Sequence, residues 1–399
     1  MKKILFVNKS FEIGGIQSSL DNLLNAMSKD ESFELDLLVF NPLGIYRDSV
    51  PENINIIKPS IFIRAMFMTF KQAVDTRNVL IIIYKLLATV WAKLFGNEIP
   101  LRIAFMFQGR LKGYDYAFAY HHEVRRDTTV DGFARFLIKR CDAKHKMVWI
   151  HTDIVSSGLN TKQNRSTYSK LDKIVAVSYG VRKSFVKAFP EMSDKTVVVH
   201  NFQKFNRIIE MAADETAEYK NDAVNFLTVS RISQEKGHMR AVNIFERLKR
   251  EGYNFYWHLV GGADTFWEDN IRQAITKKGL TDNIIMHGAQ LNPYSFFVNA
   301  DCLLVPSYNE GAPIVFSEAR CLKLPVITTK TSSAEEFISE KNVGIVCENT
   351  DEALFDTIKY VLDNPEVLNE YKNILNSMPL VDESKKEFLE LLNKEQKYE

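Results

Sequence analysis

The sequence predicts an α/β protein with two parallel sheets, one in each half of the chain. Three observations support this prediction. The chain has 399 residues, about twice the ~100–200 residues of a single domain. Short β-branched and apolar runs alternate with amphipathic helical segments, as β-α-β units require. The alternation occurs in two series, and a mixed polar stretch over residues 212–222 lies between them.

In the first half, apolar spacing over Gln17–Met27 predicts a helix. Strands are predicted at Ile4–Asn8, Phe33–Phe40, Tyr116–Tyr120, Met147–His151 and Lys173–Ser178. In the second half they are predicted at Phe226–Ser230, Tyr256–Gly261, Ile284–Gly288, Cys302–Pro306, Val326–Thr329 and Gly344–Val346. We therefore expect one domain over residues 1–202, a second over 203–375, and a charged helical segment over 376–399.

Charge and cysteine usage exclude several classes of protein. Lys and Arg number 51 against 50 Asp and Glu, so no global positive field attracts nucleic acid. The cysteines lie far apart in apolar runs, which is typical of reduced thiols in a cytoplasmic protein and not of a zinc site. They are Cys141, Cys302, Cys321 and Cys347. The apolar run after Lys2-Lys3 is too short for a signal peptide, and no stretch reaches the ~20 apolar residues of a membrane span.

Segment 61–112 differs from the rest of the first half because apolar runs are mixed with cations. It holds eight Lys or Arg residues against Asp75 and Glu98, a net charge of +6. Basic amphipathic helices of this kind lie on anionic membrane surfaces, which would place the protein on the inner face of the membrane. The alternative is a set of helices that pack on the first sheet with their cations in solvent. Both interpretations remain open.

The most informative motif runs from Val305 to Glu318. A buried strand ends at Pro306, a loop carries Glu310 and Gly311, and Pro313 takes the position of a first helical residue. A helix that begins beside the carboxyl end of a strand is where α/β sheets bind ligands, and its first N–H groups suit a phosphate. Glu318 can face back toward a ribose. Two carboxylates eight positions apart are common by chance, so the strand–loop–helix context carries the argument.

Two further loops supply groups for an anion. Arg231 and Lys236 follow the strand at Phe226–Ser230, where a guanidinium fork and an ammonium can neutralise a diphosphate. Gly14 and Gly15 follow the first strand and allow backbone N–H groups to approach a phosphate. Taken singly, these are also ordinary surface cations and an ordinary turn. A dinucleotide fingerprint and a P-loop are both absent, which argues against those nucleotide-binding classes.

In their order and spacing, the motifs of residues 173–350 resemble the retaining group-one (family four) glycosyltransferases of the GT-B fold. The N-terminal half matches loosely, through Gly14-Gly15 and Trp149-Ile150-His151-Thr152. The C-terminal motifs are Ser230-Arg231 with Lys236, Val260-Gly261-Gly262, Met286-His287-Gly288, Ala300-Asp301, Pro306-Ser307, Glu310 with Glu318, Pro325-Val326-Ile327 and Ala334-Glu335.

The resemblance implies two Rossmann-like domains that face a cleft, with a nucleotide-sugar donor held mainly by the C-terminal one. Arg231 and Lys236 would bind the diphosphate, Glu310 the transferred sugar and Glu318 the ribose. Gly14, Gly15, Gly261 and His287 would line the donor site, with the backbone near His287 at the base. The diphosphate would also meet the backbone at Gly311, Ala312, Pro313, Ile314 and Val315. Each of these residues except the proline offers an N–H group. His151 would lie beside the acceptor and sugar, and His121-His122-Glu123 is a second acceptor-side candidate, chiefly through His122.

The expected reaction follows from charge and from this resemblance. Arg231, Lys236 and a helix N-terminus can stabilise a departing diphosphate without a metal, and no two Asp residues stand two positions apart as in an Asp-x-Asp metal motif. We expect a metal-independent, retaining transfer of a hexose from a UDP- or GDP-sugar to a growing lipid-linked surface glycan, with no cofactor. A sugar-nucleotide epimerase needs no acceptor, a phosphorylase needs free phosphate, and a non-catalytic nucleotide-sugar-binding subunit would bind donor without transfer. These remain the alternatives.

Overall fold

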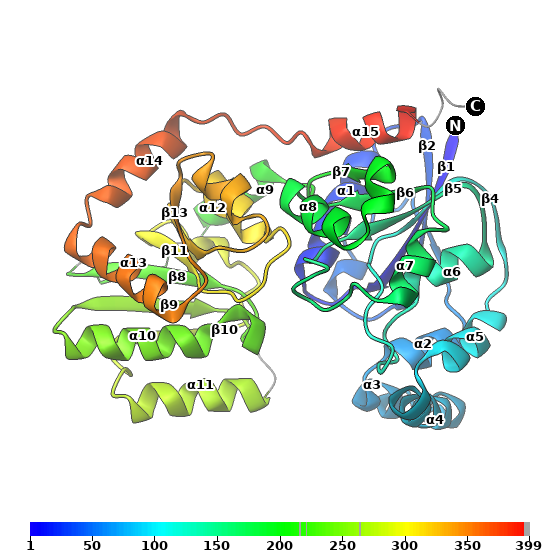
Figure 1. The fold of residues 1–399 in the computed structure, drawn as a ribbon, viewed down its shortest axis with the longest axis horizontal. Helices are drawn as coiled ribbons and strands as arrows, with labels where there is room; N and C mark the ends of the chain where they lie inside the picture. Colours follow the sequence, from blue (N-terminus) through cyan, green and yellow to red (C-terminus); the bar gives the residue numbers. More distant parts are fainter. Residues whose placement is uncertain (215–216, 221, 263–264, 395–399) are drawn as a thin grey trace. The chain divides into compact units, whose positions relative to one another are not determined.

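A computed structural model describes residues 1–214, 217–220, 222–262 and 265–394. The chain forms two compact units, each with a parallel sheet (Figure 1). Unit 1 contains Met1–Gln203 and the described residues from Asp382 onward, and unit 2 contains Lys204–Val381. The described residues thus confirm the predicted α/β class with two parallel sheets. The end of the predicted segment 376–399, residues 395–399, lies outside the described part.

Unit 1 is built on seven described strands in the order β3-β2-β1-β4-β5-β6-β7, and every neighbouring pair is parallel. The strands are β1 (Lys2–Ser10), β2 (Phe33–Asn41), β3 (Asn55–Ile57), β4 (Leu111–Ala119), β5 (Cys141–Ile150), β6 (Lys173–Ala176) and β7 (Thr196–Val198). The two three-residue edge strands, β3 and β7, escape the sequence pattern because they are so short. Because β1, β4 and β5 are neighbours, the loops that follow them meet at one edge.

The helices of unit 1 include four that fill segment 61–112. These are α2 (Ile61–Phe67), α3 (Phe70–Asp75), α4 (Val79–Phe95) and α5 (Glu98–Met106). The others are α1 (Gly15–Met27), α6 (Phe133–Arg140), α7 (Lys162–Tyr168), α8 (Tyr179–Ala188) and α15 (Ser384–Lys394), with short helices η1 (Ile45–Arg47) and η2 (Pro190–Lys195). Within the described residues, no helix combines the length and apolarity needed to cross a bilayer.

Helix α15 belongs to the core of unit 1 although the sequence pattern shows mainly its charge. The buried ring of Phe388 lies near those of Phe6, Phe118 and Trp149, with centroids 5.5–6.3 Å apart. The Glu387 carboxylate accepts hydrogen bonds from the backbone N–H of His200 at 2.9 Å and from its ring Nδ1 at 2.8 Å. The last helix therefore returns to the first unit.

Unit 2 contains six described strands in the order β10-β9-β8-β11-β12-β13, again all parallel. They are β8 (Val224–Val229), β9 (Phe255–Val260), β10 (Ile284–Gly288), β11 (Cys302–Val305), β12 (Val326–Thr329) and β13 (Gly344–Cys347). The sheet lies between two apolar clusters, one around Trp257 and Phe245 and one around Phe316 and Leu375. Both faces are covered, which explains the continuous apolar strands.

The helices of unit 2 are α9 (Phe205–Asp214), α10 (His238–Arg250), α11 (Thr265–Lys277), α12 (Ile314–Cys321), α13 (Asp351–Asp363) and α14 (Val367–Ser377), with short helices η3 (Gln234–Lys236), η4 (Tyr294–Phe296) and η5 (Glu335–Ser339). Strands β8 and β11 are adjacent. The loops carrying the predicted phosphate-binding residues therefore leave neighbouring strands at the same edge.

Candidate functional site

The loops after β8 and β11 are joined by their backbones. The Tyr308 N–H donates to the Glu235 carbonyl at 2.9 Å. Gly237 lies between them with φ +71°, and a Cβ there would stand 1.9 Å from the carbonyl oxygen of Pro306. Only glycine permits this approach, because the left-handed backbone and the close carbonyl both exclude a side chain. The two loops thus form one continuous rim on unit 2.

Lys236 and Glu310 meet on this rim, as an ion pair 74 residues apart in sequence. The Lys236 ammonium donates to Glu310 Oε1 at 2.6 Å, and the Ser307 hydroxyl donates to the same oxygen at 2.7 Å. The Glu310 side chain is 9% exposed. The structure therefore brings together two predicted site residues and adds Ser307, which the sequence motifs contained without a role.

Arg231 does not join this pair. Its side chain is 70% exposed and lies 3.8 Å from the Glu235 carboxylate. At that distance and exposure the ion pair contributes little energy, so the guanidinium can turn toward a new anion at small cost. Arg231 and Lys236 share one loop, but only Lys236 is held in place.

The neighbouring loops after β9 and β10 are also joined by a backbone hydrogen bond and a close approach at a glycine. The Gly261 N–H donates to the Gly288 carbonyl at 2.8 Å, and a Cβ on Gly261, at φ +148°, would stand 1.9 Å from the Ser230 carbonyl oxygen. His287 Nε2 lies 3.1 Å from His258 Nδ1. Burial lowers the pKa of both imidazoles, to about 4 for His258, so this pair is neutral near pH 7. The predicted Gly261 and His287 thus lie in the same row of loops.

Helix α12 begins one residue later than the sequence predicts. Pro313 is its N-cap, with an extended ψ of 125°, and Ile314 is the first helical residue. Among the described residues, no side chain caps this end with a hydrogen bond. Gly311 is buried, whereas Ala312, Pro313, Ile314 and Val315 are half-buried. The helix dipole makes this end favourable for an anion.

Glu318 lies in the second turn of α12 and is held by a residue that the sequence motifs did not reveal. The Tyr294 hydroxyl donates to Glu318 Oε1 at 3.0 Å. Desolvation raises the pKa of Glu318 to about 7, while this hydrogen bond lowers it. Glu318 is therefore partly protonated at neutral pH, and its acceptor capacity depends on pH.

Arg240 packs against the rim through Tyr308. The sequence motifs did not identify this residue either. Its guanidinium Nε lies 2.9 Å from the Asp351 carboxylate, Nη1 donates to Asn349 at 2.7 Å, and the group stacks 4.3 Å from the Tyr308 ring centroid. Its two hydrogen-bond partners lie 109 and 111 residues away in sequence, so no local signal could have identified it.

The predicted residues of unit 1 follow β1, β4 and β5. Gly14 is the N-cap of α1 and Gly15 its first residue. The Tyr120 and His151 rings lie 5.1 Å apart and the His121 and His122 rings 4.8 Å apart. The structure thus gathers the glycine turn and the histidines at one sheet edge.

Several buried polar atoms at this edge have no hydrogen-bond partner among the described residues. They are Nε2 of His151, Nδ1 of His122, Nε1 of Trp149 and Oδ1 of Asn8. Desolvation lowers the pKa of His151 to about 3 and that of His122 well below its usual value, so both imidazoles are neutral. Unsatisfied buried polar atoms are costly, and a polar ligand would satisfy them.

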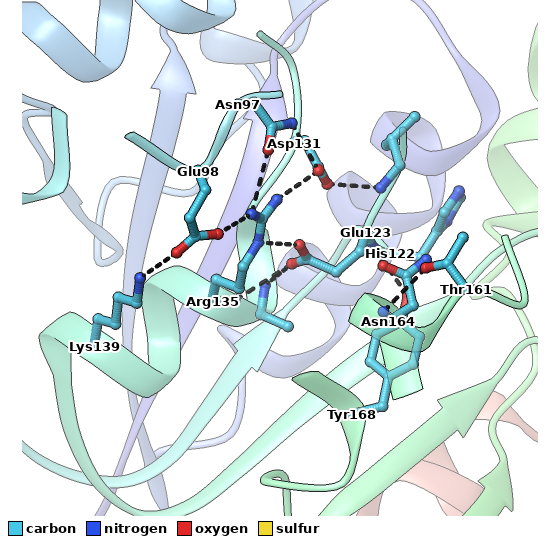
Figure 2. A network of polar contacts seen from close by, with 12 residues as sticks. Asn97, Glu98, His122, Glu123, Asp131, Arg135, Lys139, Thr161, Asn164 and Tyr168 are labelled. Carbon is cyan, nitrogen blue, oxygen red and sulfur yellow. Dashed lines mark hydrogen bonds and ion pairs between the residues drawn. The ribbon is translucent and has the colours of Figure 1, made fainter. Parts of the chain in front are cut away.

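Glu123 is not a ligand-facing group, although it belongs to the predicted His121-His122-Glu123 motif. Its carboxylate accepts from the Ala134 N–H at 2.7 Å, at the N-terminus of α6, and from Arg135 Nε at 2.7 Å (Figure 2). Arg135 also binds Asp131 and Glu98, and Asp131 accepts from the Val124 N–H at 2.7 Å. This buried network anchors the loop that carries His122, so Glu123 has a structural role.

In the described part of the chain, no three His, Cys, Asp or Glu side chains gather as a metal site. The donor-side candidates lie in unit 2, and Gly14, Gly15, His122 and His151 lie in unit 1.

Comparison with known proteins relates unit 2 to one family. Residues 212–376 match the family described as glycosyl transferases group 1. The capsular polysaccharide biosynthesis glycosyltransferase CapM of Staphylococcus aureus is 26% identical over 249 residues, 61% of this chain and 60% of CapM. The N-acetylgalactosamine-N,N'-diacetylbacillosaminyl-diphospho-undecaprenol 4-alpha-N-acetylgalactosaminyltransferase of Campylobacter jejuni is 24% identical over 208 residues, 52% of this chain and 55% of that enzyme. The chain thus spans little more than half the length of these curated relatives.

Solved structures extend the likeness to both units. The crystal structure of Anabaena HepE in complex with UDP matches with a TM-score of 0.65 at 16% identity, covering 99% of this chain and 100% of HepE. At this identity the match shows the fold.

Proposed function

The C-terminal unit belongs to the group 1 glycosyltransferase family, and the chain has the GT-B fold. We therefore propose that the protein is a retaining hexosyltransferase of surface-polysaccharide biosynthesis. Its donor is a UDP- or GDP-sugar and its acceptor a growing, lipid-linked glycan. CapM is named for capsular polysaccharide biosynthesis, and the Campylobacter enzyme for an α-linkage and a diphospho-undecaprenol acceptor. HepE, which has the same fold, was solved with UDP.

The contact between Lys236 and Glu310 carries this proposal. An ammonium and a carboxylate that are held 2.6 Å apart on neighbouring loops present both charges that a nucleotide-sugar requires. In our proposal Lys236 and Arg231 bind the diphosphate, together with the first turn of α12. Glu310 accepts hydrogen bonds from the hydroxyls of the transferred sugar, and Ser307 keeps its carboxylate in place. Glu318 binds the ribose, and the backbone beside Gly261 and His287 meets the base.

The acceptor is proposed to bind at the β1, β4 and β5 edge of unit 1. The unpartnered Nε2 of His151 and Nδ1 of His122 are available to sugar hydroxyls. A neutral imidazole can donate from one nitrogen and accept at the other, which suits a hydroxyl group. Gly14 and Gly15 form the N-terminus of α1, whose backbone N–H groups suit a phosphate.

In the proposed reaction the acceptor oxygen attacks the anomeric carbon from the face that the diphosphate leaves. The bond between this carbon and the phosphate oxygen breaks, and the acceptor proton passes to a leaving phosphate oxygen. The products are the glycoside and the nucleoside diphosphate. Lys236 and Arg231 stabilise the developing charge, a task worth several kcal/mol in preorganised sites. We propose that they do so without a metal ion.

We also propose a cytoplasmic site of action. The four cysteines are free thiols in the structure, which is compatible with a reducing compartment.

The first experiment identifies the donor nucleotide. Thermal unfolding is measured with UDP, GDP, CMP and ADP, because a ligand at a hundred times its dissociation constant adds ~2.7 kcal/mol. We expect UDP or GDP alone to raise the melting temperature. A selective response to ADP or CMP contradicts the proposed donor class.

The second experiment tests the carrying contact with the corresponding nucleotide-sugar and a lipid-linked acceptor. Lys236→Met is expected to lower kcat/KM for the donor about a hundredfold. The matched control is Lys359→Met, which removes a surface ion pair with Glu251 and is expected to change the rate less than about twofold. Wild-type transfer by both Lys236→Met and Glu310→Gln overturns the site. Loss of transfer in EDTA, restored by Mn²⁺, overturns metal independence, and product anomers of inverted configuration overturn retention.

A further inference from the structure

Helix α4 is turned so that its larger apolar side chains face away from the protein. Ile83, Leu87, Val90 and Leu94 follow one another at three- and four-residue spacing, which places them on one side of the helix. All four are at least half exposed, and Leu94 is 67% exposed. A surface helix normally presents charged and polar side chains on this side.

The opposite side of α4 is buried and includes a lysine, a residue type that is usually found in solvent. Ile81, Lys85, Ala88 and Ala92 are its buried residues. The Lys85 ammonium donates to the Met66 carbonyl at 3.1 Å and to the Thr129 hydroxyl at 2.8 Å, so the inward side is fixed by hydrogen bonds. The apolar stripe is therefore a stable feature of the folded unit.

The exposed stripe continues beyond α4. Helix α4 packs against α2, α3 and α5 and lies at the edge of unit 1 (Figure 1). On α5 and the residue after it, Ile99, Met106 and Phe107 are each at least half exposed. We call these residues, with the outward side of α4, the α4 face. Large apolar side chains exposed together on packed helices mark an interaction site.

The charges around the α4 face are almost all positive. Lys71, Arg77, Lys93 and Arg102 are exposed, and within the described residues none of them forms an ion pair. Lys93 lies three residues after Val90, and Arg102 lies between Ile99 and Met106 on α5, so both border the apolar side chains. The acidic Glu98 is neutralised by Arg135 and Lys139, which leaves Asp75 as the exposed acid of α2–α5.

Exposed apolar side chains bordered by cations favour an anionic lipid surface over a second copy of the chain. A symmetric dimer formed through the α4 face would set the same cations against one another, because such an interface repeats one patch on both subunits. An anionic lipid surface offers acyl chains to the stripe and phosphates to the cations. Trp91 and Phe95, 40% and 67% exposed, suit the boundary between headgroups and acyl chains.

We propose that the α4 face docks unit 1 on anionic phospholipid bilayers, with the outward side of α4 in the interfacial layer and Lys93 and Arg102 on lipid phosphates. The helix lies in the plane of the surface. This binding is independent of glycosyl transfer, and it would hold the enzyme where a lipid-linked acceptor is embedded. Of the two interpretations of segment 61–112, it selects the membrane one.

The test measures co-sedimentation of the full chain with vesicles that contain no glycan acceptor, so the result does not depend on the proposed activity. Vesicles of phosphatidylcholine are compared with vesicles that also contain phosphatidylglycerol, at low and high salt. We expect preferential binding to the anionic vesicles that weakens with salt. Leu87→Gln/Leu94→Gln is expected to weaken this binding at least about tenfold. The matched control, Tyr360→Gln/Val381→Gln, removes comparably exposed apolar side chains from unit 2 and should bind as wild type.

Charge variants and a spectroscopic measurement complete the test. Lys93→Gln/Arg102→Gln should remove most of the preference for phosphatidylglycerol, whereas the exposed pair Lys277→Gln/Lys372→Gln should not. Brominated lipids should quench the fluorescence of Trp91, and Trp91→Phe should abolish that quenching in an otherwise folded protein. The proposal is overturned if the wild type does not bind anionic vesicles or if Leu87→Gln/Leu94→Gln binds equally well. Sedimentation of the wild type as a dimer that this double variant dissociates, without vesicle binding, would assign the α4 face to a second copy.

Discussion

Replacing Arg135 by methionine is predicted to destabilise unit 1 strongly. The side chains of Arg135, Glu123 and Asp131 are only 7%, 1% and 2% exposed, so removing the guanidinium leaves two buried carboxylates without their cation. Breaking a buried pair in this way costs about 3–5 kcal/mol. Glu98 adds less than about 1 kcal/mol, because it is 43% exposed. Glu123 and Asp131 would still accept hydrogen bonds from backbone N–H groups. We therefore expect a loss of stability of about 3 kcal/mol, the lower limit of this range.

The assay is native-state hydrogen exchange measured by mass spectrometry. A loss of about 3 kcal/mol accelerates the slowest amides of β4 and β5 by about a hundredfold. Peptides from β8 and β9 in unit 2 serve as an internal control, and their exchange should not change. We also expect weaker glycan-acceptor binding in Arg135→Met, because the network anchors the loop carrying His122.

Two further results decide whether charge is the cause. Arg135→Met/Glu123→Gln/Asp131→Asn should recover part of the lost stability, because neutral amides carry a smaller desolvation cost than carboxylates. In Arg135→Met the unpaired carboxyls should have raised pKa values, so its deficit against wild type should shrink as pH falls from about 8 to 5. Exchange within about fivefold of wild type, or a deficit independent of pH, refutes the argument.

Three other substitutions test the remaining structural claims. Gly237→Ala should lower the stability of unit 2 by at least about 2 kcal/mol, because it strains a left-handed backbone and displaces the Pro306 carbonyl. It should also weaken nucleotide binding. An unchanged urea midpoint and nucleotide affinity would show that the loops after β8 and β11 separate freely. Since the pKa of Glu318 is raised to about 7 in the folded state, unit 2 should lose stability as pH rises from about 5 to 7, and Glu318→Gln should remove that slope in urea titrations at each pH. Phe388→Ala should destabilise unit 1 by about 3–5 kcal/mol while the unfolding of unit 2 is unchanged; a uniform effect on both units contradicts the assignment of α15 to unit 1.

The strands were predictable wherever they are central and fully buried. Continuous apolar runs such as Ile4–Asn8 and Val326–Thr329 have few alternatives to a parallel strand that is covered on both faces. The edge strands β3 and β7 are three residues long and carry too few residues for a period. The start of α12 was misplaced by one position, because Pro313 suits both an N-cap with extended ψ and a first helical residue.

The candidate site was predictable only as a set of parts. The sequence motifs identified Lys236 and Glu310 separately, and the adjacency of β8 and β11 turned them into an ion pair. Tyr294 and Arg240 were missed because their partners are distant in sequence. Glu123 was misjudged for a related reason, since its carboxylate is engaged by Arg135 and by the N-terminus of α6.

By itself the sequence determined the two α/β units, the family of the C-terminal one and the loops that carry its polar residues, because apolar period and glycine placement are local properties of the chain. Only the tertiary structure decided which charges pair, which histidine nitrogens stay unpartnered and which side of α4 faces outward. Those outcomes depend on burial and on strand order, which are set by contacts between residues far apart in sequence.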